Sequence, residues 1–516
     1  MQNAGDDNTG VVVFFWGEYS GRCSYSVPSL VDYACKWVAE DGVWSLQTQD
    51  IPSTARSAII YSVDEDLLDQ ACWDAEDALD SSAAWRGWED DYQGSGEAIA
   101  VVVERKGPND HGTLVSSAYP GISENQEGSG PPYKYFAPYA MRHYHNLDTE
   151  IIIQNSGQRC TQIWLDYQKQ GDDDFSYSQK ISQLAPGESI RIRVPEVLGV
   201  EWLGSIYIES DEPLGIILDQ TSLLPSYDMG TLLTYQARSY KLRMDTLFFA
   251  DLVFREVSGW QASIQVQNLT QESRPTWVTV EFFDQSGDSI LYVGDWVPRA
   301  GGKTFFLPAI VDLGINYPAG YVGAAVIESH AQVDYPGGYH DGQPIFVVVD
   351  LKKTKLYDEA LPGWRHTIAG ETQGGAYNAH AEDDVEEASP IMLPILAKDH
   401  QGVTSLIAIR NNSNCNNIGI KLEVRKGTGT TLTYVTTFSL QPGHIKLIDL
   451  ANIGTVKPGF IGAGIVEVTS VEQLCDTNAN GHIDPKPIMP SVVVVNRGTG
   501  PGDVTEVYEG LPWIDP

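Results

Sequence analysis

Short runs of alternating or purely apolar residues recur along the chain, separated by turns that contain Gly and Pro. Residues 189–194 alternate apolar and polar side chains, and residues 345–349 are entirely apolar. Alternation is typical of a strand with one buried face, and a short apolar run bounded by turn residues is typical of a buried strand. The pattern therefore predicts a protein built of β-strands.

One unit of this pattern is repeated. Segments 136–155, 249–268 and 393–412 align without a gap, and each contains an opening strand, a polar loop and a second strand that ends at an Asn. These closing residues are Asn155, Asn268 and Asn412. Self-similarity of this kind predicts several copies of one structural unit.

Later parts of each copy match as well. A Pro-Gly turn, as at 186–187 and 442–443, precedes a strand. A further strand carries Gly at the same place in each copy, at Gly204, Gly323 and Gly462. This placement indicates a bulge or a close approach of another backbone segment. Each copy then closes with an apolar strand, at 213–219, 344–350 and 490–496.

The N-terminal region contains a fourth, partial copy. Residues 98–104 match the closing strand, 58–61 the strand after the turn and 11–15 the second strand, so the opening strand is missing. A sandwich without an edge strand exposes backbone groups and apolar core. Two explanations remain open: the register is wrong or the loop between copies covers the edge, or a strand from another subunit completes the sheet.

The predicted fold is all-β, with four tandem antiparallel β-sandwich domains of immunoglobulin-like type arranged as beads on a string. The predicted parts are 1–125 (sandwich one), 130–240 (sandwich two), 245–363 (sandwich three), 364–387 (an acidic linker) and 388–516 (sandwich four, with a calcium-type loop).

Residues 64–91 depart from the strand pattern, because apolar residues recur there at helical spacing opposite an acidic face. They predict a short amphipathic helical insert that caps the first sandwich. Its apolar face is predicted to contain Leu67, Leu68, Ala71, Cys72, Ala75 and Leu79.

Together these motifs resemble secreted tandem β-sandwich (immunoglobulin-like) repeat proteins of the bacterial cell surface, those of filamentous bacteria in particular. The motifs that carry the resemblance are Leu393-Pro394, Gln267-Asn268, Pro442-Gly443 and the segments 320–329, 490–496 and 508–512. It covers copies two to four well and copy one in part. The resemblance implies an extracellular or cell-surface structural module and brings no active site with it.

The charge of the chain limits its partners. It contains 69 acidic and 33 basic residues, which gives a formal net charge of −36. Nucleic acids and anionic membrane surfaces are bound by clustered Lys and Arg, so neither is an expected partner. No apolar run approaches the roughly 20 residues that span a bilayer. The first residues show no secretion signal, so the chain is either cytosolic, or processed or trimmed.

The loop at 476–484 has the spacing of a calcium site. Oxygen ligands are available from Asp476, Asn478, Asn480 and Asp484, with the backbone carbonyl of His482 between them. Gly481 allows the sharp turn, but position 12 is Pro487 where an EF-hand has Glu. The prediction is a structural calcium ion; the alternative is an Asn/Gly turn without metal.

The six cysteines bear on location. Cys23, Cys160 and Cys415 occupy related places after the second strand of their copies. A Cys415–Cys475 disulfide is the favoured pairing, and Cys35 and Cys72 are candidate partners of Cys23, which leaves one of these and Cys160 unassigned. Disulfides favour an oxidising, extracellular or cell-surface location.

No nucleophile elbow, phosphate-binding loop or zinc-protease motif occurs in the sequence, so we expect no enzyme. The leading hypothesis is a structural protein that assembles with itself as a filament, sheath or surface layer, with strand complementation as one route. The alternative is a cell-surface adhesin or an array of carbohydrate-binding modules that contacts surface glycans through exposed Trp and Tyr.

Overall fold

The computed structural model describes most of the chain from residue 131 onward and parts of the N-terminal region. The described residues are 2–3, 9–16, 30–38, 51–52, 57–78, 99–100, 102–108, 114–120, 131–144, 147–157, 159–172, 174–222, 232–239, 245–257, 260–270, 274–307, 320–330, 342–353, 373–381, 390–400, 402–413, 415–426, 431–472, 490–498, 505–509 and 511–512. They form an all-β protein in which antiparallel sheets pair into several sandwich-like units. The α-helix in this part of the chain is α1 (Leu68–Ala78).

Copy two is a sandwich of two sheets. The first has the order β11-β10-β13-β8-β16 and the second the order β12-β9-β14-β15. The strands are β8 (Tyr133–Arg142), β9 (Leu147–Asn155), β10 (Thr161–Lys169), β11 (Tyr177–Leu184), β12 (Ser189–Arg193), β13 (Trp202–Ser210), β14 (Leu214–Ser222), β15 (Leu232–Gln236) and β16 (Arg238–Ser239). The short 3-10 helix η4 (Glu196–Leu198) follows β12.

Copy three repeats this order, β20-β19-β22-β17-β25 and β21-β18-β23-β24, and β17 also pairs with β18. Its strands are β17 (Leu247–Val257), β18 (Trp260–Asn268), β19 (Thr276–Phe283), β20 (Ser289–Val297), β21 (Gly302–Phe306), β22 (Tyr321–His330), β23 (Ile345–Lys353), β24 (Gln373–Asn378) and β25 (His380–Ala381). Residues 364–387 were expected to be an acidic linker. Instead, β24 and β25 lie within them, and Tyr377 and Ala381 are buried.

Copy four has the same two sheets, β29-β28-β31-β26-β34 and β30-β27-β32-β33. Its elements are β26 (Ile391–Lys398), β27 (Val403–Asn411), β28 (Asn417–Lys426), β29 (Leu432–Leu440), β30 (Ile445–Asp449), η7 (Leu450–Asn452), β31 (Phe460–Glu472), β32 (Pro490–Gly498), β33 (Thr505–Glu509) and β34 (Leu511–Pro512). Nine strands therefore recur in one order in three successive copies.

The described N-terminal elements form smaller sheets, ordered β3-β2-β4, β1-β5 and β6-β7. Their bounds are β1 (Gln2–Asn3), β2 (Thr9–Trp16), β3 (Leu30–Val38), β4 (Ser57–Asp64), η2 (Glu65–Leu67), β5 (Ile99–Ala100), β6 (Val102–Pro108) and β7 (Leu114–Pro120). The predicted helical insert is present as α1, whose buried Leu68, Ala71 and Ala75 pack against Val12 and Phe14 of β2. Leu67 lies in η2 and is exposed, and residues 79–91 are outside the described part.

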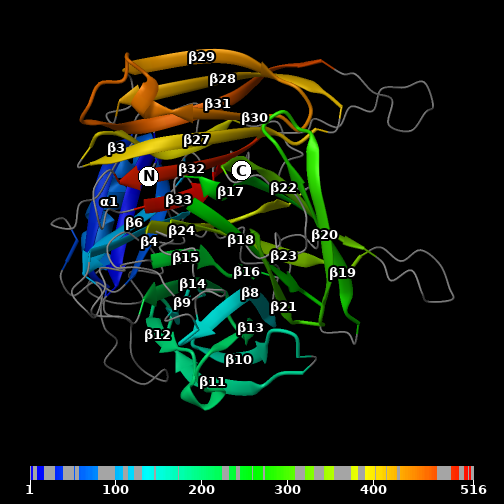
Figure 1. The fold of residues 1–516 in the computed structure, drawn as a ribbon. Helices are drawn as coiled ribbons and strands as arrows, with labels where there is room; N and C mark the ends of the chain where they lie inside the picture. Colours follow the sequence, from blue (N-terminus) through cyan, green and yellow to red (C-terminus); the bar gives the residue numbers. More distant parts are fainter. Residues whose placement is uncertain are drawn as a thin grey trace, which may run out of the picture.

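The copies pack around a common centre. The strand β15 of copy two lies beside β24 of copy three, β24 beside β33 of copy four, and β7 of the N-terminal region beside both β33 and β15. Figure 1 shows this closed arrangement, with copy two at the bottom, copy three on the right, copy four at the top and the N-terminal strands on the left. A single hydrophobic core includes residues of copies two, three and four. The expectation of separate beads on a string is therefore wrong.

Candidate functional site

Among the described residues, no group of three His, Cys, Asp or Glu side chains is placed to hold a metal ion. The polar features that recur from copy to copy are of three other kinds: clamps within a sandwich, junctions between sandwiches and open sheet edges. These positions decide how the copies hold together and which surfaces remain for a partner.

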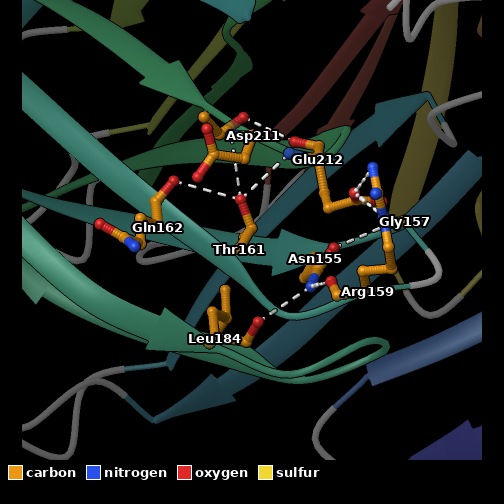
Figure 2. A network of polar contacts seen from close by, with 9 residues as sticks. Asn155, Gly157, Arg159, Thr161, Gln162, Leu184, Asp211 and Glu212 are labelled. Atoms are coloured by element: carbon orange, nitrogen blue, oxygen red, sulfur yellow. Dashed lines mark hydrogen bonds and ion pairs between the residues drawn. The ribbon is translucent and has the colours of Figure 1, made fainter. Parts of the chain in front are cut away.

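The first clamp is Asn155, the last residue of β9 (Figure 2). Its amide nitrogen donates to the carbonyl oxygens of Arg159 at 2.8 Å and Leu184 at 2.9 Å, and its side-chain oxygen accepts from the Gly157 amide at 2.9 Å. The side chain is fully buried. One amide thus ties the loop after β9 to the end of β11, and it satisfies backbone groups that burial would otherwise leave unpaired.

The same clamp recurs in the later copies. Asn268 donates to the carbonyl oxygens of Arg274 and Val297, and Asn411 donates to those of Asn416 and Leu440.

The closing Asn of copy four was expected to be Asn412, but in the structure Asn411 makes the clamp hydrogen bonds. Asn412 donates to the Ser491 hydroxyl instead. The gapless alignment of copy four was therefore displaced by one residue.

A second set of contacts surrounds the clamp of copy two (Figure 2). The Thr161 hydroxyl accepts from the backbone amides of Asp211 and Glu212 at 3.1 Å. The Glu212 carboxylate accepts from Arg159 Nε at 2.6 Å. Gly157 is required beneath it, because a Cβ there would lie 2.6 Å from the same carboxylate. These contacts tie the residues at the start of β10 to the turn between β13 and β14.

The three repeated glycines lie where predicted, at close backbone approaches. A Cβ on Gly204, Gly323 or Gly462 would collide with a carbonyl oxygen of the neighbouring strand. Each lies at a register shift against the opening strand of its copy. The expectation of a bulge or a close backbone approach is confirmed.

A Tyr on the eighth strand of each sandwich binds this shifted segment of the opening strand. Tyr235 donates to the carbonyl oxygen of Tyr139. Tyr377 donates to that of Leu252 at 2.8 Å, and Tyr508 donates to that of Ile395. These tyrosines are fully or almost fully buried. The sequence shows them as Tyr residues after each closing strand, but their role depends on the fold.

The junctions between copies also repeat. In copy three, Gln267 Nε2 lies 3.4 Å from the carbonyl oxygen of Ile206 in copy two. In copy four, Arg410 Nη1 lies 3.3 Å from the carbonyl oxygen of Ala325 in copy three. Each residue comes directly before a closing Asn. The second sheet of one copy therefore packs on the first sheet of the preceding copy in the same way twice.

Ionisable side chains are buried at both junctions. The Tyr139 hydroxyl donates to the Asp350 carboxylate, and burial raises the pKa of both groups. At the next junction, His380 Nδ1 lies 2.8 Å from Asp251 Oδ2. Arg410 lies over the rings of Phe249 and Phe283, and burial lowers its pKa. These polar contacts make the packing of one copy on the next directional.

The outer edges of the five-stranded sheets are β11, β20 and β29. Edge strands expose hydrogen-bonding groups, and proteins usually protect them with charge or Pro. The first two carry Lys180 and Asp295, whereas none of the nine residues of β29 is charged. Leu432 and Val435 of β29 are exposed. This strand is the least protected of the three edges.

The predicted calcium ligands Asp476, Asn478, Asn480, His482 and Asp484 lie outside the described residues, and the calcium site stays a prediction.

Cys23 and Cys475 also lie outside the described residues. Cys35 and Cys72 are bonded to each other, which corrects the expectation that one of them pairs with Cys23. Cys160, left unassigned above, and Cys415 are each disulfide-bonded. Disulfides indicate a non-cytoplasmic protein.

Comparisons with known proteins give no family. No family model and no curated protein matches the chain. A crystal structure of Thermotoga maritima 1070 matches with a TM-score of 0.19 and 18% identity, over 22% of this chain and 97% of that one. A tetra-tandem repeat from the extending region of a large adhesion protein matches with a TM-score of 0.11 and 8% identity, over 99% and 93% of the two chains. Both TM-scores are low, and we base no inference on either likeness.

Among the described residues, no helix has the length and hydropathy of a membrane span.

Proposed function

We propose that the protein is an extracellular structural protein that assembles with copies of itself, as a filament, sheath or surface layer at the cell surface. The proposal includes four immunoglobulin-like copies, a structural calcium ion in the 476–484 loop and a Cys415–Cys475 disulfide. No catalytic role is part of it.

Two pairings support a fourth copy at the N-terminus. The strand β2 pairs with β4, as β9 pairs with β12 in copy two. The strands β6 and β7 pair as β14 and β15 do. In addition, β7 lies in the central group with β15 and β33, where every other copy places its eighth strand.

The single observation that carries self-assembly is the uncharged outer edge of β29. The following copies contact the first sheets of copies two and three at Ile206 and Ala325, whereas an outer edge strand keeps backbone groups that can pair with a further strand. A second chain that pairs antiparallel with β29 satisfies the exposed backbone groups of both strands. The occupant is the same strand of another copy, because a two-fold axis brings identical edges together. This contact joins two chains, so a filament or layer also requires a second contact elsewhere on each chain.

Net charge favours this edge over other surfaces. Two chains of charge −36 repel one another, and an uncharged strand is where they can approach with least repulsion. Salt screens charges beyond a Debye length of about 8 Å at physiological ionic strength. We therefore expect assembly to strengthen as salt is added.

Sedimentation velocity and negative-stain imaging of the full chain at low and high salt test the proposal. We expect ordered oligomers at high salt, and their loss in a Val435→Lys/Thr437→Lys variant, because lysines on two paired edges repel. Val197→Lys is the matched control, since Val197 is 70% exposed on η4. A chain that stays monomeric at every salt concentration contradicts self-assembly; unchanged assembly of the double variant contradicts only the choice of β29.

A further inference from the structure

The outer face of β19 and β20 in copy three carries aromatic side chains that point away from the core. Trp296 is 41% exposed and Tyr292 is 58% exposed, while Trp277 is half-buried. The alternate residues of these strands, including Val278 and Leu291, are buried in the core. Because side chains alternate across a strand, the three aromatic residues lie on the opposite face.

Two of the aromatic residues are in contact with each other. Trp277 and Trp296 lie opposite each other in register, with ring centroids 5.3 Å apart and an interplanar angle of 69°. Gly294 makes room for the Trp277 ring, because a Cβ there would lie 2.6 Å from Trp277 Cζ2. The Trp277 ring therefore lies over β20 between Trp296 and Tyr292, which are on the same face of this strand.

Hydrogen-bonding groups line the same face. The buried Thr279 hydroxyl lies 2.7 Å from His330 Nε2, and His330 Nδ1 lies 3.7 Å from the Glu328 carboxylate. The Glu328 side chain is 51% exposed. Glu281 is opposite Tyr292 in register and accepts a 2.5 Å hydrogen bond from the Ser289 hydroxyl. Aromatic and polar side chains thus share one exposed sheet face.

We propose that this face is a binding site for a neutral saccharide. We call it the β19–β20 platform and define it by Trp277, Tyr292, Trp296, Glu281 and Glu328. An aromatic ring offers its face to the apolar C–H side of a pyranose, and the two carboxylates accept hydrogen bonds from the sugar hydroxyls. The inference is independent of the proposed self-assembly, which uses β29.

Charge and shape select among the possible occupants. Two carboxylates in a chain of charge −36 disfavour a polyanion and also a second copy of this face. Binding of a cation through aromatic rings is strongest where several rings surround it and exclude water. Here the two Trp rings meet edge to face and Tyr292 stands apart on the sheet, so the surface suits an extended, uncharged chain better than a single cation.

Affinity electrophoresis tests the proposal with hydroxyethyl cellulose, galactomannan and dextran as probes, followed by an array of neutral glycans. We expect at least one neutral saccharide to bind, and both Trp296→Ala and Tyr292→Ala to weaken its binding about tenfold. Glu328→Gln keeps the side-chain size and should also weaken binding. Trp73→Ala is the matched control, because Trp73 is 76% exposed on α1, outside the platform.

A folding control and four binding results decide whether the proposal holds. Circular dichroism and thermal unfolding establish that each variant is folded. Silence of all three polysaccharides and of the array overturns the proposal. Binding that Trp296→Ala and Tyr292→Ala leave unchanged also overturns it, and so does retardation by oligolysine in place of neutral glycans. The Val435→Lys/Thr437→Lys variant should bind saccharide normally, so failure of assembly and failure of the platform are distinguishable.

Discussion

The Tyr139 hydroxyl on β8 donates a hydrogen bond to the Asp350 carboxylate on β23, 211 residues further along the chain. Both side chains are buried, and Ser263 also donates to the carboxylate, at 3.2 Å. The bond crosses the junction between copies two and three. A buried polar pair disfavours every register in which its members are not opposed.

Removing the donor should destabilise the junction. Tyr139→Phe leaves a buried acceptor with one partner fewer, and we expect it to cost about 1–3 kcal/mol of unfolding free energy. The cost should be smaller in an Asp350→Asn background, because a neutral amide is cheaper to leave partly unpaired. A double-mutant cycle measured by urea unfolding gives the coupling between the two residues. Strictly additive costs would contradict a direct bond.

The pH dependence of stability follows from Asp350. Burial raises its pKa in the folded state above the ordinary value of 3.8. Its contribution to stability is therefore fully present below the unfolded pKa and is lost as the pH rises through the folded pKa. Asp350→Asn has no such loss, so its stability relative to the wild type should increase as the pH rises above about 4. Parallel unfolding curves for the two proteins between about pH 3 and pH 8 would show that Asp350 titrates normally.

The clamp in copy four distinguishes two adjacent residues. Asn411→Ala leaves two buried carbonyl oxygens without their donor, and we expect a loss of about 2–4 kcal/mol. Asn412→Ala removes one bond to Ser491, and we expect about 1 kcal/mol. Thermal unfolding of the two variants measures the difference. Equal costs, or a larger cost for Asn412→Ala, would favour Asn412 as the closing residue of copy four, as the alignment predicted.

Close backbone approach makes Gly323 intolerant of any side chain. Gly323→Ala places a methyl group against the carbonyl oxygen of Phe283 and the Tyr321 ring, and we expect a loss of about 1–3 kcal/mol. Gly454→Ala is the control, since a Cβ there meets nothing within 4 Å. Calorimetry should show a lowered midpoint for the first variant and an unchanged or slightly raised one for the second.

The Cys35–Cys72 disulfide links β3 to α1 across a separation of 37 residues. For a loop of that size, the chain-entropy estimate is a contribution of about 4 kcal/mol. Cys35→Ser/Cys72→Ser should therefore raise amide hydrogen exchange in β3 and α1. Exchange in β28 and β31 of copy four serves as the internal control. Unchanged exchange in α1 would mean that packing on β2 alone holds the helix.

The calcium prediction is tested by removing the metal. A chelator should lower the unfolding midpoint, and added calcium should restore it. At a hundredfold excess over the dissociation constant, calcium should add about 2.7 kcal/mol to the free energy of unfolding. Asp476→Ala should abolish this response, because it removes the first ligand of the loop. A midpoint that is indifferent to calcium would favour an Asn/Gly turn without metal.

Much of the local structure is readable from the sequence, since strands and turns depend on neighbouring residues. Apolar alternation and Pro-Gly turns identify the strands of copies two to four, and the repeated glycines identify the close approaches. The helix α1 is readable from its 3.6-residue period. In contrast, the pattern predicts Asn412 as the closing residue of copy four where the structure has Asn411. Two adjacent Asn residues satisfy the same pattern, and only the hydrogen bonds distinguish them.

The sequence by itself determined the repeated unit, its strand content and the acidic charge that surrounds it, because these follow from local pattern and composition. Only the tertiary structure decided which faces meet. The pattern of the β24 segment predicted a linker because the segment is polar and rich in Gly. In the structure, however, β24 lies beside β23 and the central strands. The Tyr139–Asp350 bond and the closed group of β7, β15, β24 and β33 join residues far apart in the chain. No periodicity specifies such partners, because they are selected by packing the whole chain at once.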